Sequence, residues 1–125
     1  MAAPLSSRGT PGRDPRRLAQ RLARRIALEV EALERPHLRA AGERLLGRVL
    51  AAGEALAVAD EAGGEEGRAA RAREGLAGCR FLLEVLGSEG AVPGSSLREI
   101  ATGIRVLERA LPASGEGRAA GRRAW

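Results

Sequence analysis

The chain has 125 residues, with 21 lysines plus arginines, 16 aspartates plus glutamates and a formal net charge of +5. This length allows one small domain with a single hydrophobic core. The lone cysteine, Cys79, excludes an internal disulfide, and a single histidine without any lysine or tyrosine excludes most general acid–base and nucleophilic sites. We therefore expect a protein that is not an enzyme.

The basic residues apart from His37 are all arginine, because the sequence contains no lysine. GC-rich codon usage accounts for this bias, and phosphate binding by the planar guanidinium group is the alternative explanation. No apolar run approaches the ~18 residues that a membrane-spanning helix needs, and the first ten residues lack the pattern of a secretory signal. We expect a cytoplasmic protein.

Breaks in the pattern divide the chain into two tails and four segments of helical length. Residues 1–13 and 113–125 are rich in Gly, Arg and other small or polar residues, which predicts a disordered basic N-terminal tail and a flexible basic C-terminal tail. Residues 14–112 form the predicted domain. Within it, breaks occur at Arg35-Pro36, at Gly63-Gly64 and between Gly87 and Ser95.

The first helix is predicted to begin at Asp14, an N-cap residue followed by Pro15 at the first helical position. An apolar residue then recurs every three or four positions, at Leu18, Leu22, Ile26, Val30 and Leu33. The second helix is predicted from His37 to Ala62. It contains Gly42, Gly47 and Gly53, which weaken a helix by up to ~1 kcal/mol each unless they allow close packing.

The third helix is predicted from Glu65 to Leu86, with a heptad pattern of apolar residues that Phe81, Leu82 and Val85 widen. The fourth helix is predicted to begin with a capping box, in which Ser96 is the N-cap and Glu99 follows three residues later. Its apolar stripe comprises Leu97, Ile100, Ile104, Leu107 and Leu111.

Helices of this length joined by short connections predict an all-α protein, an antiparallel up-and-down four-helix bundle. The additional apolar surface of the third helix predicts burial against another subunit, so we expect a homo-oligomer.

Arginines are concentrated in the first half of the first helix and in the C-terminal tail. On a helix, the spacing places Arg17, Arg21, Arg24 and Arg25 largely on one side, away from the apolar stripe, which favours contact with phosphates. A solvated helix face is the alternative. The sequence has no Asn and one Gln, so nucleic-acid binding would be mostly independent of base sequence. The candidate nucleic-acid-binding residues are Arg16, Arg17, Arg21, Arg24, Arg25, Arg118, Arg122 and Arg123, and the terminal Trp125 could stack on a base.

Metal and cofactor sites are not expected. His37 has no second histidine or nearby cysteine to complete a zinc site, and Cys79 falls in the apolar pattern of the third helix. The acidic residues around Gly63-Gly64 are typical of a solvated turn. No glycine-rich segment follows a strand, so no nucleotide-binding loop is indicated.

Two segments carry a resemblance to a known superfamily. GLAGCRFLLEVLGSEGAV, from Gly75 to Val92, and the helix LREIATGIRVLERAL that follows resemble the last two helices of a four-helix-bundle superfamily. Its members are the proteins of ribosomal-RNA intervening sequences and the accessory variability determinants (Avd-like) of diversity-generating retroelements. The resemblance extends from Leu18 to Leu111. LLGRV at Leu45–Val49 is more similar to the retroelement group, and the signature Ser-Ile-Pro-x-Asn-Ile-Ala-Glu-Gly of the ribosomal-insert group is absent.

Resemblance to the retroelement group implies a non-catalytic accessory protein. Such a protein forms a homopentamer, a ring of bundles around a central opening, and binds template RNA or cDNA through basic surfaces. It also associates with the element's reverse transcriptase. The alternative is a self-assembling structural or interaction protein of the ribosomal-RNA intervening-sequence type.

Overall fold

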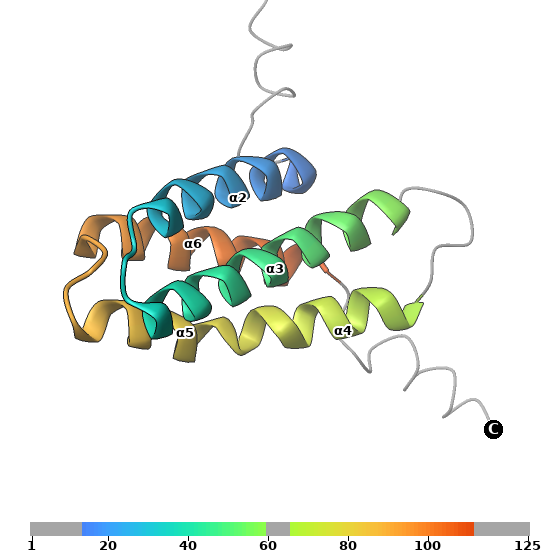
Figure 1. The fold of residues 1–125 in the computed structure, drawn as a ribbon. Coiled ribbons are helices and arrows are strands. Elements are labelled where there is room, and N and C mark those ends of the chain that lie inside the picture. Colours follow the sequence, from blue (N-terminus) through green and yellow to red (C-terminus); the bar gives the residue numbers. More distant parts are fainter. Residues whose placement is uncertain (1–13, 60–65, 112–125) are drawn as a thin grey trace, which may run out of the picture.

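The computed structural model describes residues 14–59 and 66–111 (Figure 1). The expected tails, residues 1–13 and 113–125, lie outside the described residues. All regular structure in the described part is helical, as predicted, and no strand occurs there. The helices are α2 (Pro15–Glu31), α3 (Pro36–Ala59), α4 (Glu66–Ala77), α5 (Cys79–Ser88) and α6 (Gly94–Ala110). Among them, none is long and apolar enough to cross a membrane.

The predicted start of the first helix is confirmed. Asp14 has extended backbone angles, and its side chain accepts hydrogen bonds from the backbone N–H groups of Arg16 and Arg17 at 3.2 and 3.4 Å. Pro15 occupies the first helical position, where its missing N–H costs no hydrogen bond. The second predicted helix corresponds to α3, and the expected continuation from residue 60 to 62 lies outside the described residues.

The third predicted helix is interrupted, which corrects the expectation of one continuous helix from Glu65 to Leu86. Gly78 separates α4 from α5. A guanidinium nitrogen of Arg48 on α3 donates to the Gly75 carbonyl oxygen at 3.3 Å, and it lies 2.5 Å from where a Cβ would stand on Gly78. The missing side chain of Gly78 therefore makes room for Arg48 at the interruption, a common setting for a helix kink.

The predicted capping box of the fourth helix is wrong. Pro93 is the N-cap, since its carbonyl oxygen accepts from the Leu97 N–H at 3.0 Å, so the N-cap lies three residues earlier than expected. Ser96 is then the third residue of the helix. Its side chain is buried and bonds to α2 instead of capping α6.

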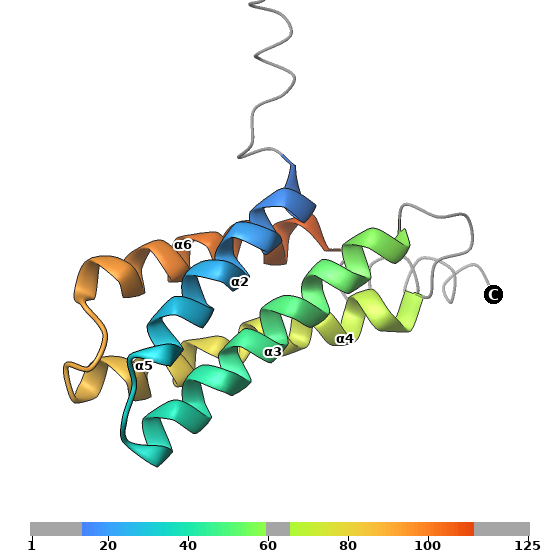
Figure 2. The same ribbon diagram turned by 45° about the horizontal axis from the view of Figure 1, so that its top comes forward.

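Each helix packs against its neighbours around one core. The helix α2 contacts α3 on one side and α6 on the other. The helices α4 and α5 each contact both α3 and α6. In Figures 1 and 2 the α2–α3 and α5–α6 connections lie at the same end of the molecule. The largest fully buried side chains come from all of these helices and from the residue after α6: Ile26, Leu45, Val49, Leu76, Cys79, Ile100, Leu107 and Leu111.

Two glycines allow close contacts between neighbouring helices. A Cβ on Gly53 of α3 would lie 3.3 Å from the Ala19 methyl group of α2, and one on Gly103 of α6 would lie 3.0 Å from both methyl groups of Leu22. Close packing of α2 against both neighbours leaves its opposite side facing solvent.

Candidate functional site

The exposed side of α2 carries a row of arginines. Arg17, Arg21 and Arg24 follow one another at spacings of four and three residues and are all exposed. The opposite side of the helix is buried, as Ala19, Leu22, Ala23, Ile26 and Val30 show. We call Arg17, Arg21 and Arg24 the α2 surface. Its orientation agrees with the sequence expectation.

Charge partners differ along the α2 surface. Arg17 makes only a long ion pair with Asp14, at 4.0 Å between Nε and Oδ2. Arg21 and Arg24 form no ion pair within residues 14–59 and 66–111. These two guanidinium groups therefore keep all their donors for solvent or a ligand.

Arg16 lies apart from this row. It lies about 100° around the helix from Arg17, although both residues line a groove of about 560 Å³ between the start of α2 and the end of α3. Leu50 and Glu54 of α3 belong to the same groove.

Arg25 faces α6, which corrects its expected place on the outer face. Its guanidinium group forms an ion pair with Glu99 at 2.7 Å, and its Nε lies 3.8 Å from Glu29. It also donates to the Ser96 hydroxyl at 3.0 Å, and that hydroxyl donates to Glu29 at 2.9 Å. These four side chains form an ion-pair cluster between α2 and α6, so Arg25 has a structural role there.

The remaining predicted arginines, Arg118, Arg122 and Arg123, lie outside the described residues, as does Trp125. Sequence reasoning missed a second group of exposed arginines, Arg80 on α5 and Arg98, Arg105 and Arg109 on α6. The spacings of seven and four residues along α6 indicate that its three arginines share one helix face. Glutamates next to them in the sequence balance their charge, so the segment does not stand out as basic.

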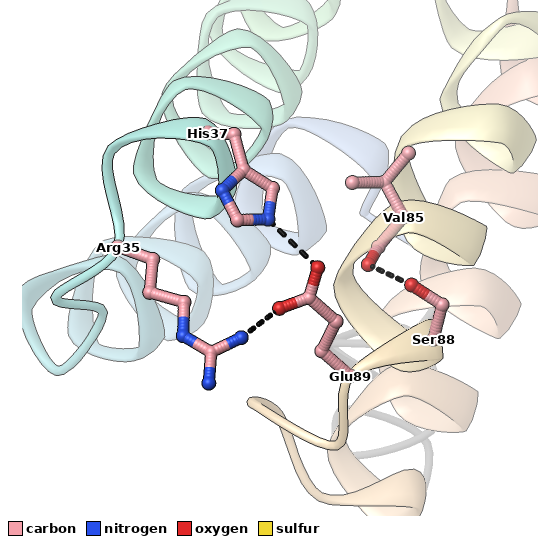
Figure 3. Close-up of polar contacts among 5 residues, drawn as sticks. All are labelled: Arg35, His37, Val85, Ser88 and Glu89. Atoms are coloured by element: carbon pink, nitrogen blue, oxygen red, sulfur yellow. Dashed lines mark hydrogen bonds and ion pairs between the residues drawn. The ribbon is translucent and has the colours of Figure 1, made fainter.

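His37 belongs to a polar contact that joins the two connections at one end of the molecule (Figure 3). Its Nε2 and a Glu89 carboxylate oxygen are 2.7 Å apart, and the other carboxylate oxygen of Glu89 pairs with Arg35. The hydrogen bond from His37 is the main cause that lowers the pKa of Glu89, and the positive charge of Arg35 adds to it. This contact places His37 between the α2–α3 and α5–α6 connections, where it helps to join them.

We expect Glu89→Gln to lower the melting temperature slightly near neutral pH. A carboxyl group whose pKa is lowered by folding stabilises the protein above its unfolded-state pKa, and this contribution disappears as pH falls. The difference from wild type should therefore begin to shrink as pH falls through the unfolded-state pKa of about 4.3, and it should vanish only once pH is below the lowered pKa of folded Glu89. Thermal denaturation followed by circular dichroism across a pH series measures it. Glu31→Gln is the control, since Glu31 is exposed and forms no ion pair in the described structure. Equal effects of the two changes at every pH would contradict a role for the Glu89 contact.

Cys79 is buried in the core, as its place in the apolar pattern predicts. Burial raises the pKa of its thiol to about 11, and the nearby Arg48 only partly offsets this effect. The thiol also points to the Gly75 carbonyl oxygen, 3.5 Å away. At neutral pH it is a protonated, unreactive group.

Groups of three or more His, Cys, Asp or Glu side chains that could hold a metal ion are not found among the described residues. The acidic residues around Gly63-Gly64 lie largely outside that part of the chain. No protein-family model, curated protein or solved structure matches this chain.

Proposed function

We propose that this protein is a non-catalytic nucleic-acid-binding protein that contacts the phosphate backbone through the α2 surface. The observation that carries the proposal is the row of Arg17, Arg21 and Arg24, of which the last two have no ion-pair partner among the described residues. Exposed guanidinium groups in a row on one helix can each donate to a phosphate oxygen.

Recognition of base sequence is not part of the proposal. The chain has no Asn and a single Gln, so it has few side chains that read base edges. The arginines lie along one helix face, where they can contact phosphates, and phosphate contacts carry no sequence information. We therefore expect similar affinity for duplexes of different sequence.

A non-catalytic role is supported by how the potential catalytic side chains are used. His37 is paired with Glu89, and Cys79 is a buried thiol whose pKa is raised to about 11. Neither is placed as a base or nucleophile beside the α2 surface.

The more specific part of the proposal is an accessory protein of a diversity-generating retroelement. In that role, up-and-down four-helix bundles assemble into a homopentameric ring that holds template RNA or cDNA for the reverse transcriptase. Its support is the resemblance of Gly75–Val92 and of the helix after it. The exposed apolar side chains of Leu28, Leu50 and Phe81 favour assembly, since they are 51–66% exposed in the single chain.

The second candidate is a self-assembling structural protein of the ribosomal-RNA intervening-sequence type, which exposed Phe81 supports equally well. Nucleic-acid binding distinguishes the two. Light scattering tests the assembly that both share, and a mass of only 13.1 kDa would contradict both.

We expect the variant R17Q/R21Q/R24Q to bind nucleic acid more weakly, with a flatter dependence on salt. Each lost phosphate contact reduces the slope of log K against log salt by about 0.9 on a DNA duplex, so three contacts reduce it by roughly 3. Fluorescence anisotropy with a short labelled random-sequence DNA duplex, titrated at several salt concentrations, measures this slope.

The matched control is R35Q/R39Q/R44Q, which removes the same number of exposed arginines from the α2–α3 connection and the start of α3. It should change the slope less than the α2 variant does, because Arg35 and Arg39 are already ion-paired with Glu89 and Glu43. An α2 variant that behaves like this control would disprove the proposed site, and a wild-type protein that binds no duplex at low salt would disprove the function.

A further inference from the structure

A second row of arginines lies on the exposed side of α6. Arg98, Arg105 and Arg109 are separated by seven and four residues, which places them on one face of the helix, and all three are exposed. The row spans about 16 Å along the helix axis. Ile100, Ile104 and other residues of the opposite face are buried.

Arg80 of α5 extends this row across a groove. Arg80 and Arg105 both line a small groove between α5 and α6, with a volume of about 60 Å³. Leu83 and Ala101 also line this groove, and Leu83 packs against the core. We call Arg80, Arg98, Arg105 and Arg109 the α6 surface.

The α6 surface keeps an excess of positive charge. None of its arginines forms an ion pair with another residue of the described structure. The carboxylate of Glu99 turns toward α2, where it pairs with Arg25. Two other carboxylates lie close by, Glu108 in the groove and Glu84 one turn beyond Arg80. The arginines outnumber them two to one.

The two arginine surfaces are separate. The side of α6 that faces α2 carries Ser96, Glu99 and Gly103, as their contacts with Arg25 and Leu22 show. Arg105 instead lies on the side that faces α5. The ion-pair cluster between α2 and α6 therefore separates the α2 surface from the α6 surface, and a phosphate row on one does not extend onto the other.

We propose that the α6 surface is a second binding site for the phosphate backbone of double-stranded nucleic acid. The inference takes its class of ligand from the proposed function but does not depend on the α2 surface. A duplex presents a phosphate every ~3.4 Å along each strand, so a 16 Å row of arginines on a rigid helix meets several of them.

A duplex fits this surface better than a single strand does. Proteins that bind single strands without sequence preference stack the unpaired bases on aromatic side chains. The exposed side of α6 carries Ser95 and Thr102 beside its arginines, and Phe81 of α5 is the one aromatic residue in the part of the chain described. Binding therefore depends on charge and on the fixed geometry of the row.

The test compares R98Q/R105Q/R109Q with R17Q/R21Q/R24Q, their combination, and the charge-matched control R35Q/R39Q/R44Q. Anisotropy with the short DNA duplex gives the salt slope for each. Because the two surfaces are separate, we expect each of the first two variants to flatten the slope of its own site by up to about 3, and only the combination to weaken binding at both sites. Circular dichroism should show unchanged helicity, because the altered side chains are exposed. The single change R105Q, expected to flatten the slope by about 1, serves if the triple variant is not folded.

The possible outcomes separate the two proposals. If R98Q/R105Q/R109Q matches the control while R17Q/R21Q/R24Q loses binding, the second site is wrong and the proposed function stands. If the reverse holds, the α6 surface is the site and the α2 surface is not. A single-stranded RNA of equal length that binds the wild type more tightly than the duplex would overturn the assignment of a duplex. If the wild-type protein does not bind the duplex at low salt, both the proposed function and the second site are wrong. An acidic protein partner would then be the remaining ligand for the α6 surface.

Discussion

Replacing Leu107 by alanine should lower the free energy of unfolding by about 2–5 kcal/mol. Leu107 has no solvent-exposed area, lies in the buried face of α6 and belongs to the hydrophobic core cluster, to which every helix contributes. The change removes the transfer free energy of the lost atoms and leaves a cavity that close-packed neighbours fill only in part. Urea denaturation followed by circular dichroism measures the loss.

Leu28→Ala is the matched control, because it makes the same chemical change at a side chain that is 61% exposed on α2. It should alter the free energy of unfolding by no more than about 0.5 kcal/mol. Similar losses for the two variants would mean that Leu107 is not in a packed core, or that Leu28 is buried in an assembly. Repeating the measurement over a range of protein concentrations distinguishes these cases, since only an assembly depends on concentration.

Gly42→Ala and Gly47→Ala should have opposite effects, although both glycines lie within α3. A Cβ on Gly42 would lie 2.7 Å from Cγ2 of Val30 and 3.2 Å from Cδ1 of Leu33. Both of these side chains are buried, and a β-branched valine is stiff at χ1, so relief requires movement of α2. We expect Gly42→Ala to lower the free energy of unfolding by about 1–3 kcal/mol.

Gly47 has no atom within 4 Å of the position of an added Cβ, and it is exposed. Alanine there keeps the helical geometry and restricts the unfolded chain, so stability should rise by up to about 1 kcal/mol. Urea denaturation of both variants measures the two signs. A stabilising Gly42→Ala would show that α2 and α3 do not approach closely at this point.

Local sequence rules predicted the start of one helix correctly and the start of another wrongly. The Asp14-Pro15 pair predicted the start of α2 correctly, because both the N-cap bond and the proline effect act within three residues. The same kind of rule failed at Ser96. Its hydroxyl has better partners across the helix pair, Arg25 and Glu29, and these are distant in the sequence. The interruption at Gly78 likewise depends on Arg48 of another helix.

The positions of the arginines likewise depend partly on local sequence and partly on contacts between helices. Periodicity predicted that Arg17, Arg21, Arg24 and Arg25 lie on the outer face of α2, and the structure agrees for the first three. Arg25 is close to them in the sequence, but one residue corresponds to a turn of about 100° around the helix, which brings its side chain within reach of Glu99. The arginines of α6 share one face of the helix, but Glu99 and Glu108 next to them balance their charge along the sequence.

The sequence by itself determined the helical class, the cap and exposed face of α2, the position of Cys79 in the core and the surplus of arginine over acidic residues. These properties depend on helical periodicity and on side-chain chemistry within a few residues. Only the tertiary structure decided which arginines have acidic partners, which glycines are needed for close packing and where the third helical segment is interrupted. Those properties depend on which helices are neighbours, and contacts between residues far apart in the sequence set them.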